Sequence, residues 1–195
     1  MVFILLSMFL HPRLAIWVAM AIPVSFGGMF ILAGGAGISI NVISLFGMII
    51  VIGILVDDGI VIAENIYQHW ERGKEPVQAA IHGTLEVLPA VFSAIVTTVI
   101  AFSLFFVIDG IMGDFFVEMG FVVVATLVFS LVEGAIILPA HVAHSKALSK
   151  KSRKGFWLRV IGWFTKILDY IKIRWYKPLL NFSFKFQSSL FFISR

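Results

Sequence analysis

The feature that most constrains this chain is an apolar run over residues 40–63 that contains two adjacent aspartates, Asp57 and Asp58. A helix rises about 1.5 Å per residue, so roughly 20 apolar residues cross a bilayer core of about 30 Å. On that rise the aspartates lie about 10 to 12 Å inside the helix end expected at Asn65. Because each mid-membrane Asp costs about 2.5 to 3.5 kcal/mol on insertion, the pair predicts a functional site.

Composition identifies an integral membrane protein. Hydrophobic residues make up 60% of the 195 residues and charged residues only 13%, whereas about a quarter of a soluble domain is charged. The absence of cysteine excludes disulfides and thiolate chemistry, and the five histidines are scattered, so the sequence predicts neither a metal site nor an enzyme. Eleven of the fifteen Lys and Arg fall between Lys146 and Lys185, which favours a segment beside anionic lipid over a nucleic-acid partner.

The apolar runs predict an all-α transmembrane helix bundle over residues 1–144. They give a partial span at 1–10 and four complete spans at about 14–34, 40–63, 87–108 and 116–138. Residues 64–86, which contain Gly73 and Pro76, are interpreted as a helix end, a turn and a short amphipathic piece that together form a solvated connector. Pro139 is expected to end the fourth span. Lys and Arg fall on alternate connectors only, which predicts that these connectors and the basic tail face the cytoplasm.

The residues after the bundle form a second predicted region. Residues 145–187 are interpreted as a basic cytoplasmic segment, and 188–195 as the start of a further, truncated span. Apolar and aromatic side chains repeat at helical spacing between Trp157 and Trp175, with basic residues largely opposite, and Pro178 ends the pattern. This pattern predicts an amphipathic helix over 157–177 that lies in the membrane interface and contacts the lipid bilayer.

The two aspartates face adjoining sides of their predicted helix. Asp57 shares a stripe with Gly53 and Glu64, and Asp58 shares one with Asn65 about 100° away. Burial and mutual repulsion favour a proton on at least one carboxylate, and the two are expected to titrate as a coupled pair. A group that gains and loses a proton inside the bilayer is what a proton-driven transporter needs. Close packing against a neighbouring helix is expected at three small residues: Gly53, Gly59 and Ala63.

The sequence contains further candidate site residues and allows other roles for the two aspartates. Glu64, Asn65 and Glu133 are possible further site residues, and Glu133 also fits an inter-helix hydrogen-bond donor without a transport role. The aspartates themselves also fit groups that only bond neighbouring helices or line a wet cavity. No Lys or Arg occurs inside any apolar span, so a cationic partner of Asp57 and Asp58 is expected from outside this sequence.

Four stretches carry a family resemblance: 41–48, 53–65, 75–80 and 89–102. The most specific is the run Val-Asp-Asp-Gly-Ile-Val from Val56, followed by Glu64 and Asn65. Through these residues the chain resembles the resistance-nodulation-division (RND) family of proton-driven efflux pumps, most firmly over residues 41–144. In that resemblance the chain corresponds to the end of transmembrane helix 2, helices 3 to 6, the interfacial helix and the start of helix 7. It thus represents half of the transmembrane domain of an inner-membrane permease subunit.

The resemblance implies a function as well as a fold. Asp57 and Asp58 match the family's proton-relay aspartates, which implies substrate/proton antiport driven by the proton gradient with no other cofactor. The family implies a homotrimer in the inner membrane of a Gram-negative bacterium, together with a periplasmic adaptor and an outer-membrane channel. The relay lysine and the porter domains lie outside this stretch. Residues 133–141 depart from the best-known multidrug pumps, so the exported substrate stays open.

Three other functions stay open at this stage. A protein-translocation accessory or lipid transporter of the same superfamily is the nearest alternative, and a non-transporting membrane scaffold is the next. An intramembrane aspartyl protease also uses two aspartates, but both must flank one peptide bond, whereas Asp57 and Asp58 point about 100° apart on one helix.

Overall fold

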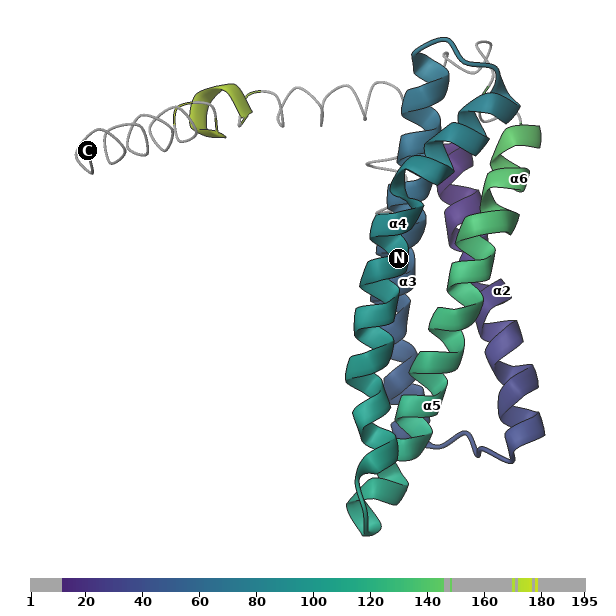
Figure 1. Cartoon of the computed structure of the whole chain (residues 1–195), viewed down its shortest axis with the longest axis vertical. Helices are drawn as coiled ribbons and strands as arrows, with labels where there is room; N and C mark the ends of the chain where they lie inside the picture. The colour runs from purple at the N-terminus through teal and green to yellow at the C-terminus, as the bar shows by residue number, and fades with distance from the viewer. Residues whose placement is uncertain (1–11, 146–147, 149–169, 171, 177, 179–195) are drawn as a thin grey trace. The chain divides into compact units, whose positions relative to one another are not determined.

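The computed structural model describes residues 12–145, 148, 170, 172–176 and 178, drawn in colour in Figure 1. The chain divides into two units, residues 1–152 and 153–195, and each is described by itself. The described part of the first unit is a bundle of long helices (Figure 1). Four helical runs in it are long and apolar enough to cross a membrane, which confirms the predicted all-α transmembrane bundle.

The four runs follow the order of the predicted spans. The first two are single α-helices, whereas the third ends in a 3-10 turn and the fourth contains a π-helical turn. Their elements are α2 (Pro12–Ala36), α3 (Val42–Glu71), α4 (Pro76–Ser103) with η1 (Leu104–Val107), and α5 (Ile111–Val132) with η2 (Glu133–Ile137) and α6 (Leu138–His144).

Helix α3 begins at a capping box and runs well beyond the charged residues that were expected to end it. The Asn41 side chain accepts hydrogen bonds from the backbone N–H groups of Ile43 and Ser44, and Ser44 Oγ accepts one from the Asn41 N–H. At the other end the chain leaves the helix at Arg72 and turns at Gly73, whose φ of 96° suits glycine.

The turn predicted within residues 64–86 is present, but the residues on both sides of it belong to the long helices. Residues 64–71 belong to α3 and α4 already begins at Pro76, which leaves only residues 72–75 between the helices. Apolar content does not limit a helix once it has left the lipid, because packing also stabilises it. Ile66 is fully buried, and the rings of Tyr67 and Trp70 lie 5.5 Å apart.

Pro139 does not end the fourth helical run, contrary to the sequence-based expectation. The Leu138 N–H donates to the Glu133 carbonyl in the π-helical turn η2, and α6 then carries the helix on to His144. A proline removes one backbone donor, and a local π-helical adjustment is a known way for a membrane helix to accommodate it. Pro139 is the second residue of α6, which directly follows this turn.

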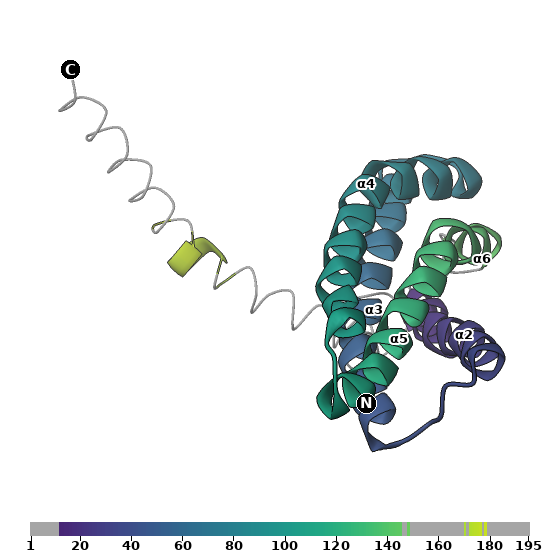
Figure 2. The same cartoon turned by 60° about the horizontal axis from the view of Figure 1, so that its bottom comes forward.

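Helix α3 packs against all three of the other long helices of the bundle, and α5 does the same. The view along the bundle in Figure 2 shows α2, α3, α4 and α5 grouped together. The buried side chains that join them are small or aliphatic, among them Val18, Val51, Ile62, Ile66 and Leu127. Since lipid is as apolar as these side chains, close contact between helices, rather than escape from water, holds such a bundle together.

Some predictions lie outside the described residues. The partial span at 1–10 and the truncated span at 188–195 are among them. Of the interfacial helix predicted over 157–177, only Tyr170 and the π-helical turn η5 (Lys172–Tyr176) are described. The interfacial helix therefore stays a prediction.

Candidate functional site

Asp57 and Asp58 lie at the middle of α3. At 1.5 Å per residue they are roughly 20 Å from either end of the helix. This depth exceeds the 10 to 12 Å expected from the sequence, because α3 continues past Asn65 to Glu71. The extra length is the charged end of the helix over residues 64–71, so the aspartates stay well inside the apolar part of α3, where an ionised carboxylate is costly.

The two aspartates face different surroundings, as their spacing on a helix predicted. Asp57 is exposed on the surface of the bundle, whereas Asp58 is half-buried and is followed directly by the buried Gly59. The Asp58 Oδ2 atom is buried and has no hydrogen-bond partner among the described residues. A buried acceptor without a partner is costly, so this oxygen is in position to bind a proton or a water molecule.

Asp58 opens onto a small pocket between α3, α4 and the fourth helical run. The pocket holds about 10 Å³, close to the smallest space that accommodates one water molecule. Its charged or titratable residues are Asp58 and Glu133, and the other lining side chains are apolar apart from Ser130. The lining residues are Leu55, Asp58, Gly59, Ile62, Leu88, Val91, Ser130, Leu131, Glu133, Gly134 and Ala135.

Glu133 is the second acidic member of this pocket. Its residue is only 4% exposed, and it begins the π-helical turn η2. Gly134 follows, and a Cβ atom there would lie 3.0 Å from Ile62 Cδ1 of α3, so the two helices are in close contact at this level. Single π-helical turns occur frequently at functional sites, and this one sets the direction in which Glu133 leaves its helix.

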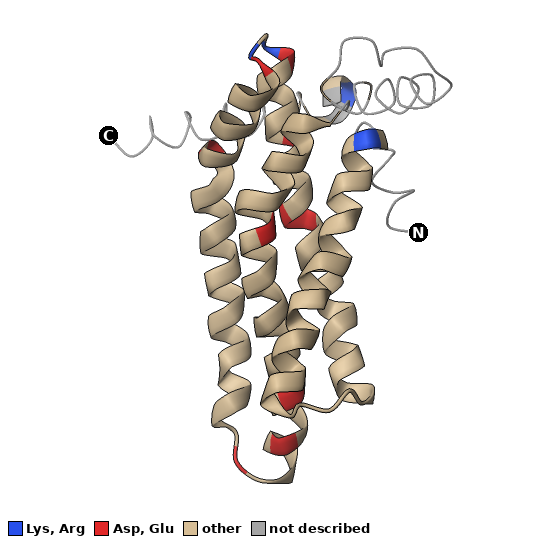
Figure 3. Ribbon diagram, turned by 90° about the vertical axis from the view of Figure 1, so that its right-hand side faces the viewer, with Lys and Arg blue, Asp and Glu red and all other residues tan. Residues whose placement is uncertain are grey.

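Basic residues do not reach this pocket from the described part of the bundle. Arg13, Arg72 and Lys74 all lie at one end of it, whereas acidic residues also occur near mid-height (Figure 3). The described residues also contain no group of three or more His, Asp or Glu that could hold a metal ion. Among the described residues, a proton or a water molecule is therefore the available partner of Asp58 and Glu133.

The three small residues expected at helix contacts differ in their surroundings. A Cβ atom on Gly59 would lie 3.0 Å from Val18 Cγ1, and Ala63 is fully buried, so both face a neighbouring helix. Gly53 is exposed, and a Cβ atom there would meet nothing within 4 Å. Close approach to α3 therefore occurs on the side of Gly59 and Ala63.

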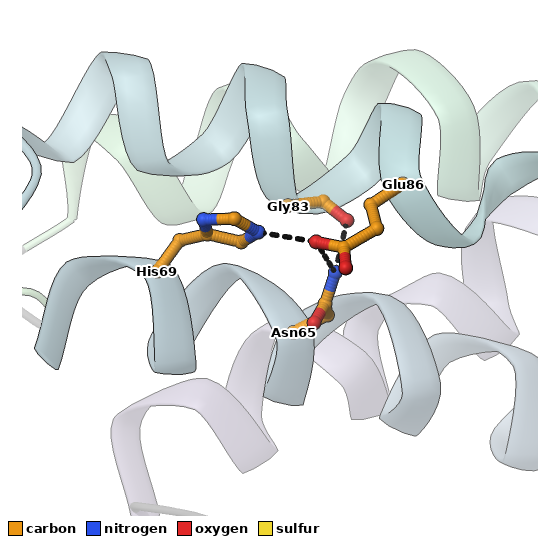
Figure 4. Close-up of polar contacts among 4 residues, drawn as sticks. All are labelled: Asn65, His69, Gly83 and Glu86. Atoms are coloured by element: carbon orange, nitrogen blue, oxygen red, sulfur yellow. Dashed lines mark hydrogen bonds and ion pairs between the residues drawn. The ribbon is translucent and has the colours of Figure 1, made fainter. Parts of the chain in front are cut away.

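Glu64 and Asn65 lie outside the acidic pocket. Glu64 is exposed, and Asn65 joins α3 to α4 (Figure 4). The Asn65 amide donates to the Gly83 carbonyl at 2.8 Å and to Glu86 Oε2 at 3.3 Å. His69 Nε2 lies 2.5 Å from the same Glu86 oxygen. Asn65, His69, Gly83 and Glu86 are named here the α3–α4 clasp.

Sequence reasoning missed the clasp because the helix was expected to end at Asn65, so that His69 and Glu86 were assigned to a solvated connector. The signal that was available is the spacing of Asn65 and His69, four residues apart and hence on one face if the helix continues. Glu86 is then the acidic residue of the following helix that is expected to lie beside Asn65 and His69.

The clasp predicts a structural effect for Asn65 that is separate from transport. We expect Asn65→Ala to lower the free energy of unfolding by about 0.6 to 1.7 kcal/mol, the range measured for hydrogen bonds between membrane helices. Proton-coupled transport per folded molecule is expected to stay near normal. Gln68→Ala, on an exposed neighbouring position of α3, serves as the control and is expected to leave both unchanged. Thermal unfolding in detergent measures the first effect, and loss of transport at normal stability would contradict the structural role.

Comparison with known proteins adds to this geometry. Residues 1–194 match the AcrB/AcrD/AcrF family. Among similar proteins, the multidrug resistance protein MdtC of Photorhabdus laumondii is 34% identical over 142 residues, which are 71% of this chain and 14% of that protein. MdtC of Escherichia coli O139:H28 is 34% identical over 161 residues, or 80% of this chain and 16% of that protein.

A relative of broader coverage carries a more general name. An uncharacterized transporter of Haemophilus influenzae is 30% identical over 176 residues, which are 87% of this chain and 17% of that protein. The chain thus spans only about a sixth of the length of the relatives that it matches.

Proposed function

The chain belongs to the AcrB/AcrD/AcrF family, and we propose that it forms part of a proton-driven efflux transporter of the RND type. It is a multi-pass inner-membrane protein of the kind found in Gram-negative bacteria. The observation that carries the proposal is the placement of Asp57 and Asp58, adjacent, in the middle of a membrane-spanning helix. The names of two relatives, multidrug resistance proteins, support export as the direction of transport.

The arrangement of the aspartates suits a proton carrier. A carboxylate that takes up a proton becomes neutral, which removes the main free-energy penalty of its position in the membrane. Binding and release of the proton therefore change the charge at the centre of α3. In this proposal the change in charge shifts the helix bundle between two packing arrangements. In this proposal Asp58 works inside the bundle, and Asp57 meets a cation from outside the described residues.

The remaining family properties are part of the same proposal. The complete transporter would act as a homotrimer with a periplasmic adaptor and an outer-membrane channel, and the proton gradient would be its energy source without a further cofactor. It would catalyse no covalent chemistry.

Reconstitution of the complete transporter tests the proposal. In proteoliposomes with an imposed pH gradient, we expect a fluorescent substrate dye to accumulate against its own gradient while protons move the opposite way. A proton ionophore is expected to stop both movements. A pH-sensitive dye trapped in the lumen reports the proton flux. If no member of a panel of dyes and detergents moves with protons, a non-transporting scaffold becomes the better account.

A further inference from the structure

We propose that Glu133 is a second proton-carrying residue of the transport site and exchanges a proton with Asp58 across the pocket that both line. This inference rests on the proposed function and extends it to a residue on another helix. It gives the two aspartates different roles, because Asp58 faces Glu133 whereas Asp57 does not line the pocket.

The geometry of the pocket supports direct exchange or exchange through one water molecule. Asp58 and Glu133 come from α3 and from η2 of the fourth run, and they line one space of about 10 Å³. That volume leaves room for about one water and not for a larger ligand. Gly134 lies close to Ile62 and Gly59 lies close to Val18, so the helices around the pocket are tightly packed.

The carboxylates of Asp58 and Glu133 are the acidic groups of the pocket. The Asp58 Oδ2 atom is buried without a hydrogen-bond partner among the described residues, and the Glu133 residue is only 4% exposed. Two carboxylates that face one small apolar space repel each other strongly when both are ionised, and such pairs share a proton. One proton held between Asp58 and Glu133 satisfies both groups, because the protonated acid donates to the other carboxylate.

Other titratable groups on the packed helices do not take part in this pocket. On α3 Asp57 lies on the exposed side, and on α4 Glu86 is engaged in the clasp. On α6 the His141 ring stacks on Trp17, and His144 bonds the Ala140 carbonyl. Helix α2 carries Arg13 at its first turn, at the end of the bundle.

A groove lies next to the pocket, on the side of one end of the bundle. It holds about 350 Å³ between α4 and the η2–α6 part of the fourth run, and its lining is apolar apart from Thr84 and His144. The lining extends from Val77 and His144 to Leu88 and Ala135, two residues that also line the acidic pocket. Along it the Thr84 residue is 4% exposed, and its hydroxyl has no hydrogen-bond partner among the described residues. An unsatisfied buried hydroxyl is a ready binding site for a water molecule.

The proton balance of the proposed step is simple. Protonated Asp58 donates its proton to the Glu133 carboxylate, so that Asp58 becomes ionised and Glu133 neutral. Glu133 then releases the proton to a water molecule that enters the pocket, and its carboxylate can accept the next proton. The net result is one proton moved from the centre of α3 toward the end of the bundle that carries Arg72 and Lys74.

The test compares Glu133→Gln with Glu133→Asp in the complete transporter. Gln keeps the size and hydrogen-bonding capacity but cannot ionise, so we expect it to lower proton-coupled transport at least tenfold at normal membrane abundance. Asp restores an ionisable group and is expected to recover a substantial part of the rate. Infrared spectra recorded as a function of pH provide a second readout, since the band of a protonated carboxylic acid is expected to weaken in Glu133→Gln.

The matched control is Glu118→Gln on α5. Its carboxylate bonds Ser39 and Asn41 near the opposite end of the bundle, and it is expected to keep both transport and the carboxylic-acid band. Full transport and an unchanged band in Glu133→Gln would overturn the inference. If that result occurs while Asp58→Asn abolishes transport, only the role of Glu133 fails. If Asp58→Asn also transports normally, the proposed function itself fails.

Discussion

Asp58→Asn and Asp57→Asn are each expected to abolish proton-coupled transport by the complete transporter while leaving it inserted in the membrane. Asn keeps the size and the hydrogen-bonding capacity of Asp but cannot exchange a proton. If the aspartates only bonded neighbouring helices, Asn would replace them at about 0.6 kcal/mol, the average for a membrane hydrogen bond. If they carry the proton, the transport cycle cannot be completed. Proton-coupled dye transport then falls to the level of membranes without the transporter.

The two variants are also expected to differ in a second measurement. Because Asp58 lines the pocket with Glu133, Asp58→Asn is expected to change the infrared band of the Glu133 carboxylic acid. Asp57 is exposed on another side of α3, so Asp57→Asn is expected to change that band much less. Dye export and membrane abundance are measured on the same preparations. Drive-dependent export by both variants at normal abundance would leave structural hydrogen bonding as the better account of the pair.

Gly83→Ala is expected to cause a large loss of folded protein. A Cβ atom at Gly83 would lie 2.7 Å from Ile66 Cα and 2.8 Å from Ile66 N, both in the backbone of α3. Since backbone cannot rotate away as a side chain can, α4 must move off α3. The hydrogen bond from Asn65 to the Gly83 carbonyl then lengthens as well. Overpacking of this kind destabilises by about 1 to 3 kcal/mol.

A glycine without neighbours provides the control for Gly83. Gly27 lies inside α2, and a Cβ atom there would meet nothing within 4 Å. Gly27→Ala is expected to be neutral or slightly stabilising, because alanine favours the helix by about 1 kcal/mol over glycine. Thermal unfolding of both variants in detergent, with membrane abundance, measures the difference. Equal stability of the two variants would contradict the close approach of α3 and α4.

The sequence predicted the helices well and their ends less well. Run length and apolar content are enough to locate a membrane helix, which is why the order of α2 to α5 agrees with the expected spans. Ends depend on local contacts that no apolar count contains. Residues 64–71 stay helical because Ile66 packs in the core and the α3–α4 clasp holds that end, and the run passes Pro139 because a π-helical turn precedes it.

The candidate site was predictable in its residues but not in its grouping. Asp57, Asp58 and Glu133 stand out because each is charged within an apolar run. Helical spacing also predicts that the two aspartates face different sides. Which side packs inward, and which residue of the fourth run faces it, depends on the rotation of two helices far apart in the sequence. The pocket shared by Asp58 and Glu133 therefore needed the structure.

The π-helical turn η2 also changes what the last part of its helix presents to its neighbours. Such a turn holds one residue more than an α-helical turn, so everything after it is rotated by about 100° relative to an uninterrupted α-helix. Glu133 at the start of the turn lines the pocket with Asp58, and His141 after the turn stacks on Trp17 with ring centroids 4.5 Å apart. With one residue removed from η2, the same sequence would rotate either Glu133 or His141 away from its partner, so the two contacts depend on one inserted residue.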